Sequence, residues 1–189
     1  MKKNFAIHHT AVSRTVQKRQ LQPVDNHHKN KYNMLSSLGY YVGYNYFIDV
    51  DGTRTKAREH DEETAANKGH NCDASERCDT ISVCLAGDFN KEHPLDVQTK
   101  ELQKLYHELS KEFELKVGGH RDIQANRTCP GTLIQDSYYR LIAQGTTGDT
   151  DLEDLEKQRL IEEQAQEIKD LQQVIQQLIL WIKSYFPQK

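Results

Sequence analysis

Long apolar runs are missing from this chain. No stretch of the 189 residues approaches the roughly 20 apolar residues that span a bilayer. The two lysines near the N-terminus are not followed by the apolar segment of a secretory signal. We therefore expect no integral membrane segment and no signal peptide. Hydrophobic residues make up 36% of the chain and charged residues 28%, which is typical of a soluble protein.

An excess of positive charge and a regular cysteine spacing are also missing. The net charge of −3 argues against nucleic acid as the main partner. Without a signal peptide, the irregularly placed Cys72, Cys78, Cys84 and Cys129 are expected to be reduced thiols. A Cys72–Cys78 disulfide stays open for a protein that acts outside a cell. Cys84 lies in an apolar segment and is expected to be a buried small residue.

A run rich in Gly, Thr and Asp at residues 145–151 divides the chain. Positive and negative charges are balanced before it, whereas acidic residues predominate after it. Such a run is typical of a boundary between domains. We predict a domain over residues 1–144, a linker over 145–151 and a C-terminal helix over 152–189.

The first 144 residues predict an α/β domain with a mixed sheet. Strands are expected at Asn4–His8, Tyr44–Val50, Thr53–Arg58 and Ile81–Gly87. Asp51-Gly52 predicts a hairpin turn between the second and third of these. Helices are expected over Val24–Ser37, 97–115 and Thr132–Ala143. The fold class that follows is a central sheet flanked by helices.

One polar, loop-like segment contains two side chains that can bind metal. His120 and Cys129 lie nine positions apart in the sequence GGHRDIQANRTCPG, which has too little apolar content for a core. Catalytic zinc sites use three protein ligands and leave a fourth position for water, and imidazole with thiolate is an accepted donor set. The third ligand is expected in the His8-His9 pair. Only one of the pair can face the loop, because neighbouring strand side chains point to opposite faces.

Four segments occur in the order found in a known family. They are Ile7–Ala11, Val42–Ile48 with Asp51–Thr53, Ile81–Phe89, and Gly119–Asp122 with Cys129–Gly131. Through them the chain resembles the zinc-dependent N-acetylmuramoyl-L-alanine amidases of the small phage lysozyme and peptidoglycan-recognition-protein family. The resemblance covers roughly residues 4–143.

The resemblance implies a Zn²⁺ cofactor held by His8, His120 and Cys129. It makes Tyr44 the catalytic tyrosine, and it places Arg127 where the family has a Lys or Thr that donates to the reacting carbonyl. Because arginine does not readily give up a proton, we expect an electrostatic role for Arg127. The alternatives are a strand aromatic for Tyr44 and a solvated loop charge for Arg127.

Other residues of the matching segments are given supporting roles. His28 and Arg121 are expected to bind substrate, with a solvated helix face as the alternative for His28. His9 is expected to be structural. No general base is identified, and Tyr44 through water, Glu62 and Glu63 all stay open.

The implied reaction is hydrolysis of the amide between N-acetylmuramic acid and the L-alanine of the stem peptide in bacterial peptidoglycan. A phage endolysin is expected, held in the host cytoplasm before lysis and then acting on the cell wall. A bacterial autolysin or recycling amidase is the alternative with the same chemistry. A recognition module without turnover and a structural zinc protein are the alternatives from other classes, and an intact His-His-Cys set disfavours both.

The C-terminal segment has a heptad pattern. Ile161, Ile168, Ile175 and Ile182 recur every seven residues, and the positions three further on are Gln164, Leu171, Leu178 and Tyr185. Such a seam predicts a coiled coil and hence a homo-oligomer of two to four chains. The alternatives are a helix that folds back on the first domain and an apolar end at 178–182 that contacts a membrane surface.

Overall fold

The computed structural model describes residues 2–67, 79–124, 126–144, 161, 164 and 166–179. The chain divides into two compact units, Met1–Thr146 and Thr147–Lys189. The predicted linker at 145–151 lies outside the described residues, as do Cys72 and Cys78 with their open disulfide.

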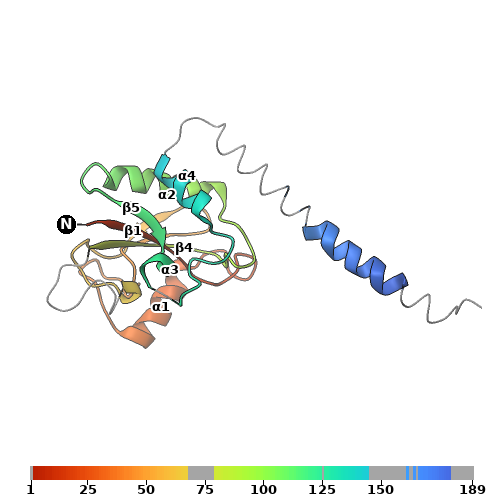
Figure 1. The fold of residues 1–189 in the computed structure, drawn as a ribbon. Coiled ribbons are helices and arrows are strands. Elements are labelled where there is room, and N and C mark those ends of the chain that lie inside the picture. The colour runs from red at the N-terminus through yellow and green to blue at the C-terminus, as the bar shows by residue number, and fades with distance from the viewer. Residues whose placement is uncertain are drawn as a thin grey trace, which may run out of the picture. The chain divides into compact units, whose positions relative to one another are not determined.

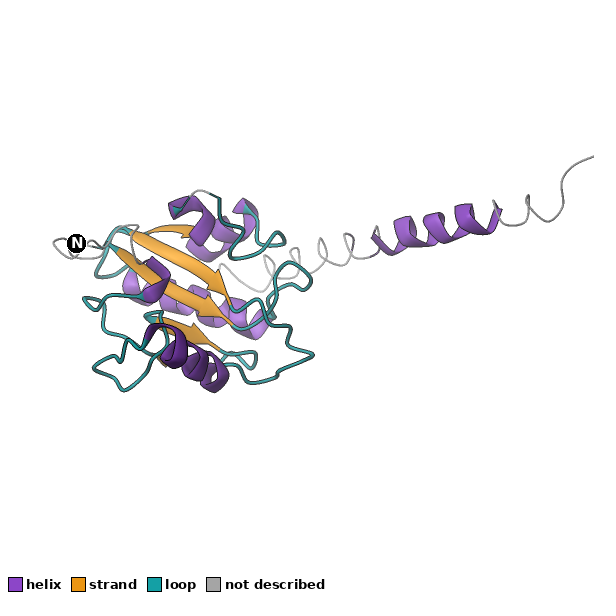
Figure 2. Cartoon of the chain, turned by 90° about the horizontal axis from the view of Figure 1, so that it is seen from below, coloured by secondary structure: helices purple, strands orange, loops and turns teal. Residues whose placement is uncertain are grey.

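A five-stranded sheet forms the centre of the first unit (Figures 1 and 2). Its strands are β1 Asn4–His9, β2 Tyr46–Ile48, β3 Arg54–Lys56, β4 Thr80–Leu85 and β5 Lys116–Gly119, in the order β3-β2-β4-β1-β5. Only β3 pairs antiparallel, with β2; the other pairs are parallel. The central strand β4 is buried along its whole length, as expected for a parallel strand covered on both faces.

Helices cover both faces of this sheet. Helices α2 (Asp96–Leu109) and α4 (Asp136–Gln144) lie on one side, and α1 (Leu21–Tyr32) lies on the other (Figure 1). Helix α2 buries Leu102, Leu105 and Leu109, which share one helical face. A one-turn helix, α3 (His120–Ile123), follows β5, and a 3₁₀ turn spans Ala65–Asn67.

The predicted fold class, a mixed sheet flanked by helices, is confirmed, and so is the hairpin around Asp51-Gly52. Cys84 is fully buried, as expected. The first helix ends at Tyr32 and not at Ser37, because Asn33 adopts a left-handed conformation and its N–H bonds the carbonyls of His28 and Lys29. Strand β5 was not predicted, because Lys116–Gly119 contains two glycines and a single apolar residue.

The described part of the second unit is helical at residues 161, 164 and 166–179. The helix is therefore present, whereas the coiled coil stays a prediction. Its large apolar side chains are exposed, with Ile168 at 55%, Leu171 at 56% and Ile175 at 53%. In the part of the chain that the structure describes, no helix has the length and apolar character needed to cross a bilayer.

Candidate metal centre

Two histidines meet at the carboxyl ends of adjacent parallel strands. His8 is near the end of β1, and His120 directly follows Gly119 of β5, which pairs with Ile7 of β1. Because parallel strands end at the same edge of a sheet, the two imidazole rings lie side by side, with centroids 4.7 Å apart. His8 is 1% exposed.

A turn brings Cys129 back to the same place. The N–H of Arg121 donates to the carbonyl oxygen of Cys129 at 2.9 Å. The guanidinium of Arg121 donates to the carbonyl of Gly131 at 2.8 Å and to that of Ile134. The Cys129–Pro130 peptide bond is cis. These contacts leave the Cys129 Sγ 3.7 Å from the Nδ1 of His8.

Gly119 makes this approach possible. A Cβ at position 119 would overlap the ring of Pro130 and the hydroxyl of Tyr139. Only glycine therefore lets the turn that contains Cys129 pack against the end of β5.

The three side chains fit a zinc ion. The ligand atoms of His8, His120 and Cys129 all lie within 4.8 Å of one another, and within the described residues no second group of this kind is found. Zn–S and Zn–N bonds of about 2.3 and 2.0–2.1 Å in a tetrahedron place sulfur and nitrogen about 3.6 Å apart. The observed 3.7 Å between Cys129 Sγ and His8 Nδ1 matches this separation.

Burial sets the protonation of the candidate ligands. It lowers the pKa of His8 well below its ordinary value, with His120 as the next cause, so this ring is neutral as a ligand must be. Burial raises the pKa of the Cys129 thiol to about 11 in the metal-free protein. Binding of a cation by the thiolate would therefore release a proton.

A pocket of about 210 Å³ opens over these side chains. It is lined by the three candidate ligands and, among others, by His28, Tyr32, Tyr44, Gln124 and Arg127. The structure thus brings together six of the seven sequence-predicted site residues, namely the three candidate ligands, Tyr44, Arg127 and His28.

Tyr44 lies in a bend just before β2 and not within the predicted strand. Its ring centroid is 5.1 Å from that of His8 and 5.6 Å from that of His28. Burial, with the Cys84 thiol as the next cause, raises the pKa of Tyr44 well above its ordinary value. The phenol is therefore protonated at neutral pH and can donate a hydrogen bond into the pocket.

The protonation state and tautomer of His28 follow from its surroundings. Its Nδ1 accepts the N–H of Gly43 at 2.9 Å, so this nitrogen has no proton. Burial lowers the pKa of His28 to about 4, so the ring is neutral at pH 7 and its proton is on Nε2. His28 is thus a neutral hydrogen-bond donor in the wall of the pocket.

Gln124 was missed by the sequence analysis. Its Oε1 lies 3.0 Å from the Nε2 of His120 and 2.8 Å from the Nε of the exposed Arg127. The only sequence signal is its position four residues after His120, which places two side chains on one face of a helical turn.

Several predicted or alternative residues lie elsewhere. Arg121 does not line the pocket, and its guanidinium lies over the ring of Tyr139, 5.9 Å from the centroid. His9 faces away from His8, and its Nδ1 accepts the N–H of Phe89 at 3.1 Å. Glu62 accepts the N–H groups of Ser37 and Glu59, each at 2.7 Å. Neither Glu62 nor Glu63 lines the pocket.

The contacts of Arg121 predict a structural role that can be measured. We expect Arg121→Leu to lower the free energy of unfolding by about 2–4 kcal/mol, because charged hydrogen bonds to two carbonyls are lost. Urea denaturation measures this, and Arg140→Leu, which removes an exposed arginine of α4, is the control. An Arg121→Leu protein of unchanged stability whose KM for muropeptides is raised would instead support substrate binding.

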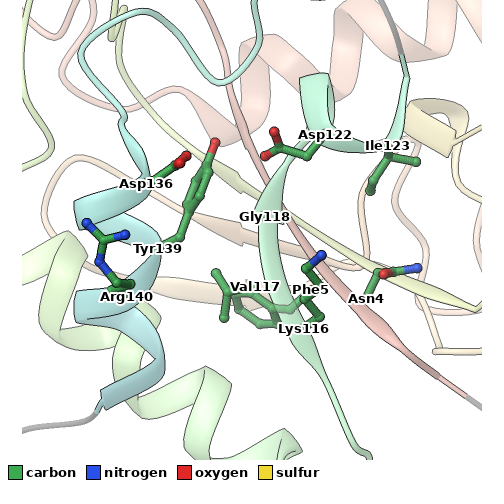
Figure 3. A pocket seen from close by; sticks show the side chains of 10 residues that line it. All are labelled: Asn4, Phe5, Lys116, Val117, Gly118, Asp122, Ile123, Asp136, Tyr139 and Arg140. Carbon is green, nitrogen blue, oxygen red and sulfur yellow. The ribbon is translucent and has the colours of Figure 1, made fainter.

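A larger pocket is lined by residues of β5, of the start of β1 and of α4 (Figure 3). Its volume is about 360 Å³, and its lining includes Asp122, Asp136, Tyr139 and Arg140. No histidine or cysteine lines it, and none of the candidate catalytic residues does. The volume of a pocket alone therefore does not identify the candidate reaction site.

Known proteins share this architecture. The solved structure of the N-acetylmuramoyl-L-alanine amidase LysC from Clostridium intestinale URNW is similar, with 18% identity over 77% of this chain and 87% of that chain and a TM-score of 0.58. The Ph2119 endolysin from the Thermus scotoductus MAT2119 bacteriophage Ph2119 is similar too, with 19% identity over 74% of this chain and 84% of that chain and a TM-score of 0.53. The bumblebee PGRP-SA shares 20% identity over 72% of this chain and 80% of that chain, with a TM-score of 0.56. At these identities the likeness supports the fold alone.

Sequence comparison supports more than the fold. Among curated proteins, none has a sequence that matches this chain. The profile of one protein family, described as N-acetylmuramoyl-L-alanine amidase, matches residues 3–132. This match includes the whole sheet, and His8, Tyr44, His120 and Cys129 all fall within it. The chain therefore belongs to the N-acetylmuramoyl-L-alanine amidase family.

Proposed function

We propose that the chain is a zinc-dependent amidase that cleaves the bond between N-acetylmuramic acid and the L-alanine of the stem peptide in bacterial peptidoglycan. The observation that supports it best is the gathering of His8, His120 and Cys129 in one pocket with Tyr44. Three protein ligands leave one position of a tetrahedral zinc ion open, which is the arrangement of catalytic rather than structural sites.

The chain supplies hydrogen-bond donors around the place where the amide would react. When bound, zinc would activate water and polarise the scissile carbonyl. The protonated phenol of Tyr44 and the permanent charge of Arg127 are donors suited to the developing negative charge. The neutral Nε2–H of His28 suits a carbonyl or hydroxyl oxygen of the substrate.

Recognition without turnover is the second candidate function. A binding module needs neither the thiol nor an open metal position, and family members that only bind peptidoglycan generally lack the ligand cysteine. The presence of Cys129 beside His8 therefore favours hydrolysis.

The biological setting that we propose is that of a phage endolysin. The similar structures include one named as a phage endolysin and one named as an amidase, LysC. In this setting the enzyme collects in the host cytoplasm and reaches the cell wall at lysis. A bacterial autolysin or recycling amidase would use the same site.

Purified peptidoglycan sacculi test the reaction. Cleavage of this amide creates a free amino group on L-alanine and no new reducing sugar end. We expect about one zinc per chain by elemental analysis and N-terminal alanine on the released peptides. A protein that contained zinc and bound sacculi but released no peptide would support the recognition module. New reducing sugar ends would contradict the amidase assignment.

We also propose that the C-terminal helix associates with copies of itself. In the described part, Ile161, Ile168 and Ile175 recur every seven residues, and each is more than half exposed. Leaving such side chains in water forgoes roughly 1.5–3 kcal/mol for each large residue. Exposed Val174 and Ile179 widen the apolar face beyond a narrow seam, which suits two to four chains.

Matched charge substitutions test this association. We expect the full chain to be an oligomer by light scattering at micromolar concentration, and Ile168→Lys with Ile175→Lys to make it monomeric. Gln166→Lys with Gln173→Lys adds the same charge away from the heptad seam and should leave the oligomer intact. The monomer should cleave soluble muropeptides normally but lyse whole cells more slowly, because avidity is lost. A monomeric unmodified chain would contradict the proposal.

A further inference from the structure

One side chain connects a candidate zinc ligand to the positive charge at the pocket. The Oε1 of Gln124 lies within hydrogen-bonding distance of both the Nε2 of His120 and the Nε of Arg127. The backbone holds Gln124 in place as well, since its N–H donates to the carbonyl of His120 at 2.9 Å. The side chain is partly buried and lines the pocket.

The identity of the shared atom follows from the chemistry of arginine. A guanidinium nitrogen can only donate, so the Gln124 atom that faces Arg127 must be the amide oxygen. An amide oxygen can only accept, so the Nε2 of His120 must carry the proton. A neutral imidazole with its proton on Nε2 has its free lone pair on Nδ1.

We propose that Gln124 is a positioning residue for the metal centre: it holds His120 in the Nε2–H tautomer, so that Nδ1 is the atom offered to zinc, and it anchors Arg127 beside the pocket. The inference rests on the proposed function only in taking His120 as a zinc ligand. His8 has no such support among the described residues, because its Nε2 is buried without a hydrogen-bond partner. Among the three candidate ligands, the orientation of His120 therefore depends on Gln124.

Zinc affinity is the first readout. Loss of the partner that orients a metal-bound histidine typically weakens metal binding about 10–100-fold. We expect Gln124→Leu to do so in competition with a chromophoric chelator, because leucine cannot accept a hydrogen bond. Gln124→Glu keeps an acceptor and should bind zinc at least as tightly as the unmodified protein. Gln135→Leu, on the exposed surface, is the matched control and should leave the affinity unchanged.

The tautomer of His120 in the metal-free protein is the second readout, and it needs no zinc and no activity. Long-range ¹H–¹⁵N NMR should show the Nε2–H form in the unmodified protein and a mixture of tautomers in Gln124→Leu. An Nδ1–H form in the unmodified protein would overturn the inference. So would a folded Gln124→Leu protein with unchanged zinc affinity.

The two readouts separate this inference from the proposed function. If the unmodified protein bound no zinc, the proposed function would fail, while the tautomer measurement would still decide the role of Gln124. If the unmodified protein bound zinc and cleaved sacculi, but Gln124→Leu left the zinc affinity unchanged, only the positioning role would fail. Should Gln124→Leu not fold, the tautomer of the unmodified protein and the zinc affinity of Gln124→Glu still test the proposal.

Discussion

Cys129→Ser and His120→Ala should each remove zinc and amidase turnover together. Each variant leaves only two of the three ligand side chains that lie within 4.8 Å of one another. A serine hydroxyl stays protonated at neutral pH and does not replace a thiolate, which is the form of cysteine that binds zinc. We expect elemental analysis to find no bound zinc and the release of N-terminal alanine from sacculi to fall to background.

His9→Ala is the control for this prediction. His9 is next to His8, but its Nδ1 bonds the N–H of Phe89 on the other face of the sheet. The variant should lose about 1–3 kcal/mol of stability, because a buried N–H is left without a partner, yet it should keep measurable zinc. A metal-free His9→Ala protein, together with a His8→Ala protein that still held zinc and cut substrate, would show that the ligand assignment is wrong.

Tyr44→Phe should keep stoichiometric zinc but lose about 100-fold or more in rate. The phenol lies beside His8 in the pocket and stays protonated, so its loss removes one donor to the developing oxyanion. Removal of one such donor typically costs 10²–10³ in kcat. Steady-state kinetics on soluble muropeptides, with zinc content measured on the same samples, would show this separation of metal binding from turnover.

Tyr46→Phe is a matched control two residues away. The Tyr46 hydroxyl bonds the Nε2 of His60 at 2.8 Å, and Tyr46 does not line the pocket. Its variant should therefore turn over at close to the normal rate. If the rate of Tyr44→Phe were within twofold of that of the unmodified protein, Tyr44 would be only an aromatic residue next to the strand.

In the unmodified enzyme, a chelator should abolish turnover and added zinc should restore it.

The elements that could be predicted are those whose sequence pattern is local. Strand β4 is a mainly apolar segment with β-branched residues, and α2 has leucines at helical spacing. Strand β5 could not be predicted, because its two glycines belong to a strand only through pairing with β1. That same non-local pairing sets His120 beside His8, so the site could be inferred from the order of the motifs but not from periodicity.

Side-chain direction was the other part that the sequence could not supply. The resemblance gives Arg121 and Arg127 different roles, but nothing in the sequence shows where either side chain points. In the structure the guanidinium of Arg121 is bound to backbone carbonyls, whereas Arg127 lines the pocket. The role that we propose for Gln124 likewise depends on the position of its Oε1 between the Nε2 of His120 and the Nε of Arg127, which the sequence does not show.

The turn at Cys129 is held through its main-chain carbonyls, which accept hydrogen bonds from Arg121. Arg121 bonds the carbonyls of Cys129, Gly131 and Ile134, and none of these contacts involves the thiol. If Cys129 is a zinc ligand as we propose, a single codon change at position 129 would remove turnover while the scaffold and its pocket persist. On that assignment, a descendant that binds the cell wall without cutting it would be one mutational step away, with no need to rebuild the fold first.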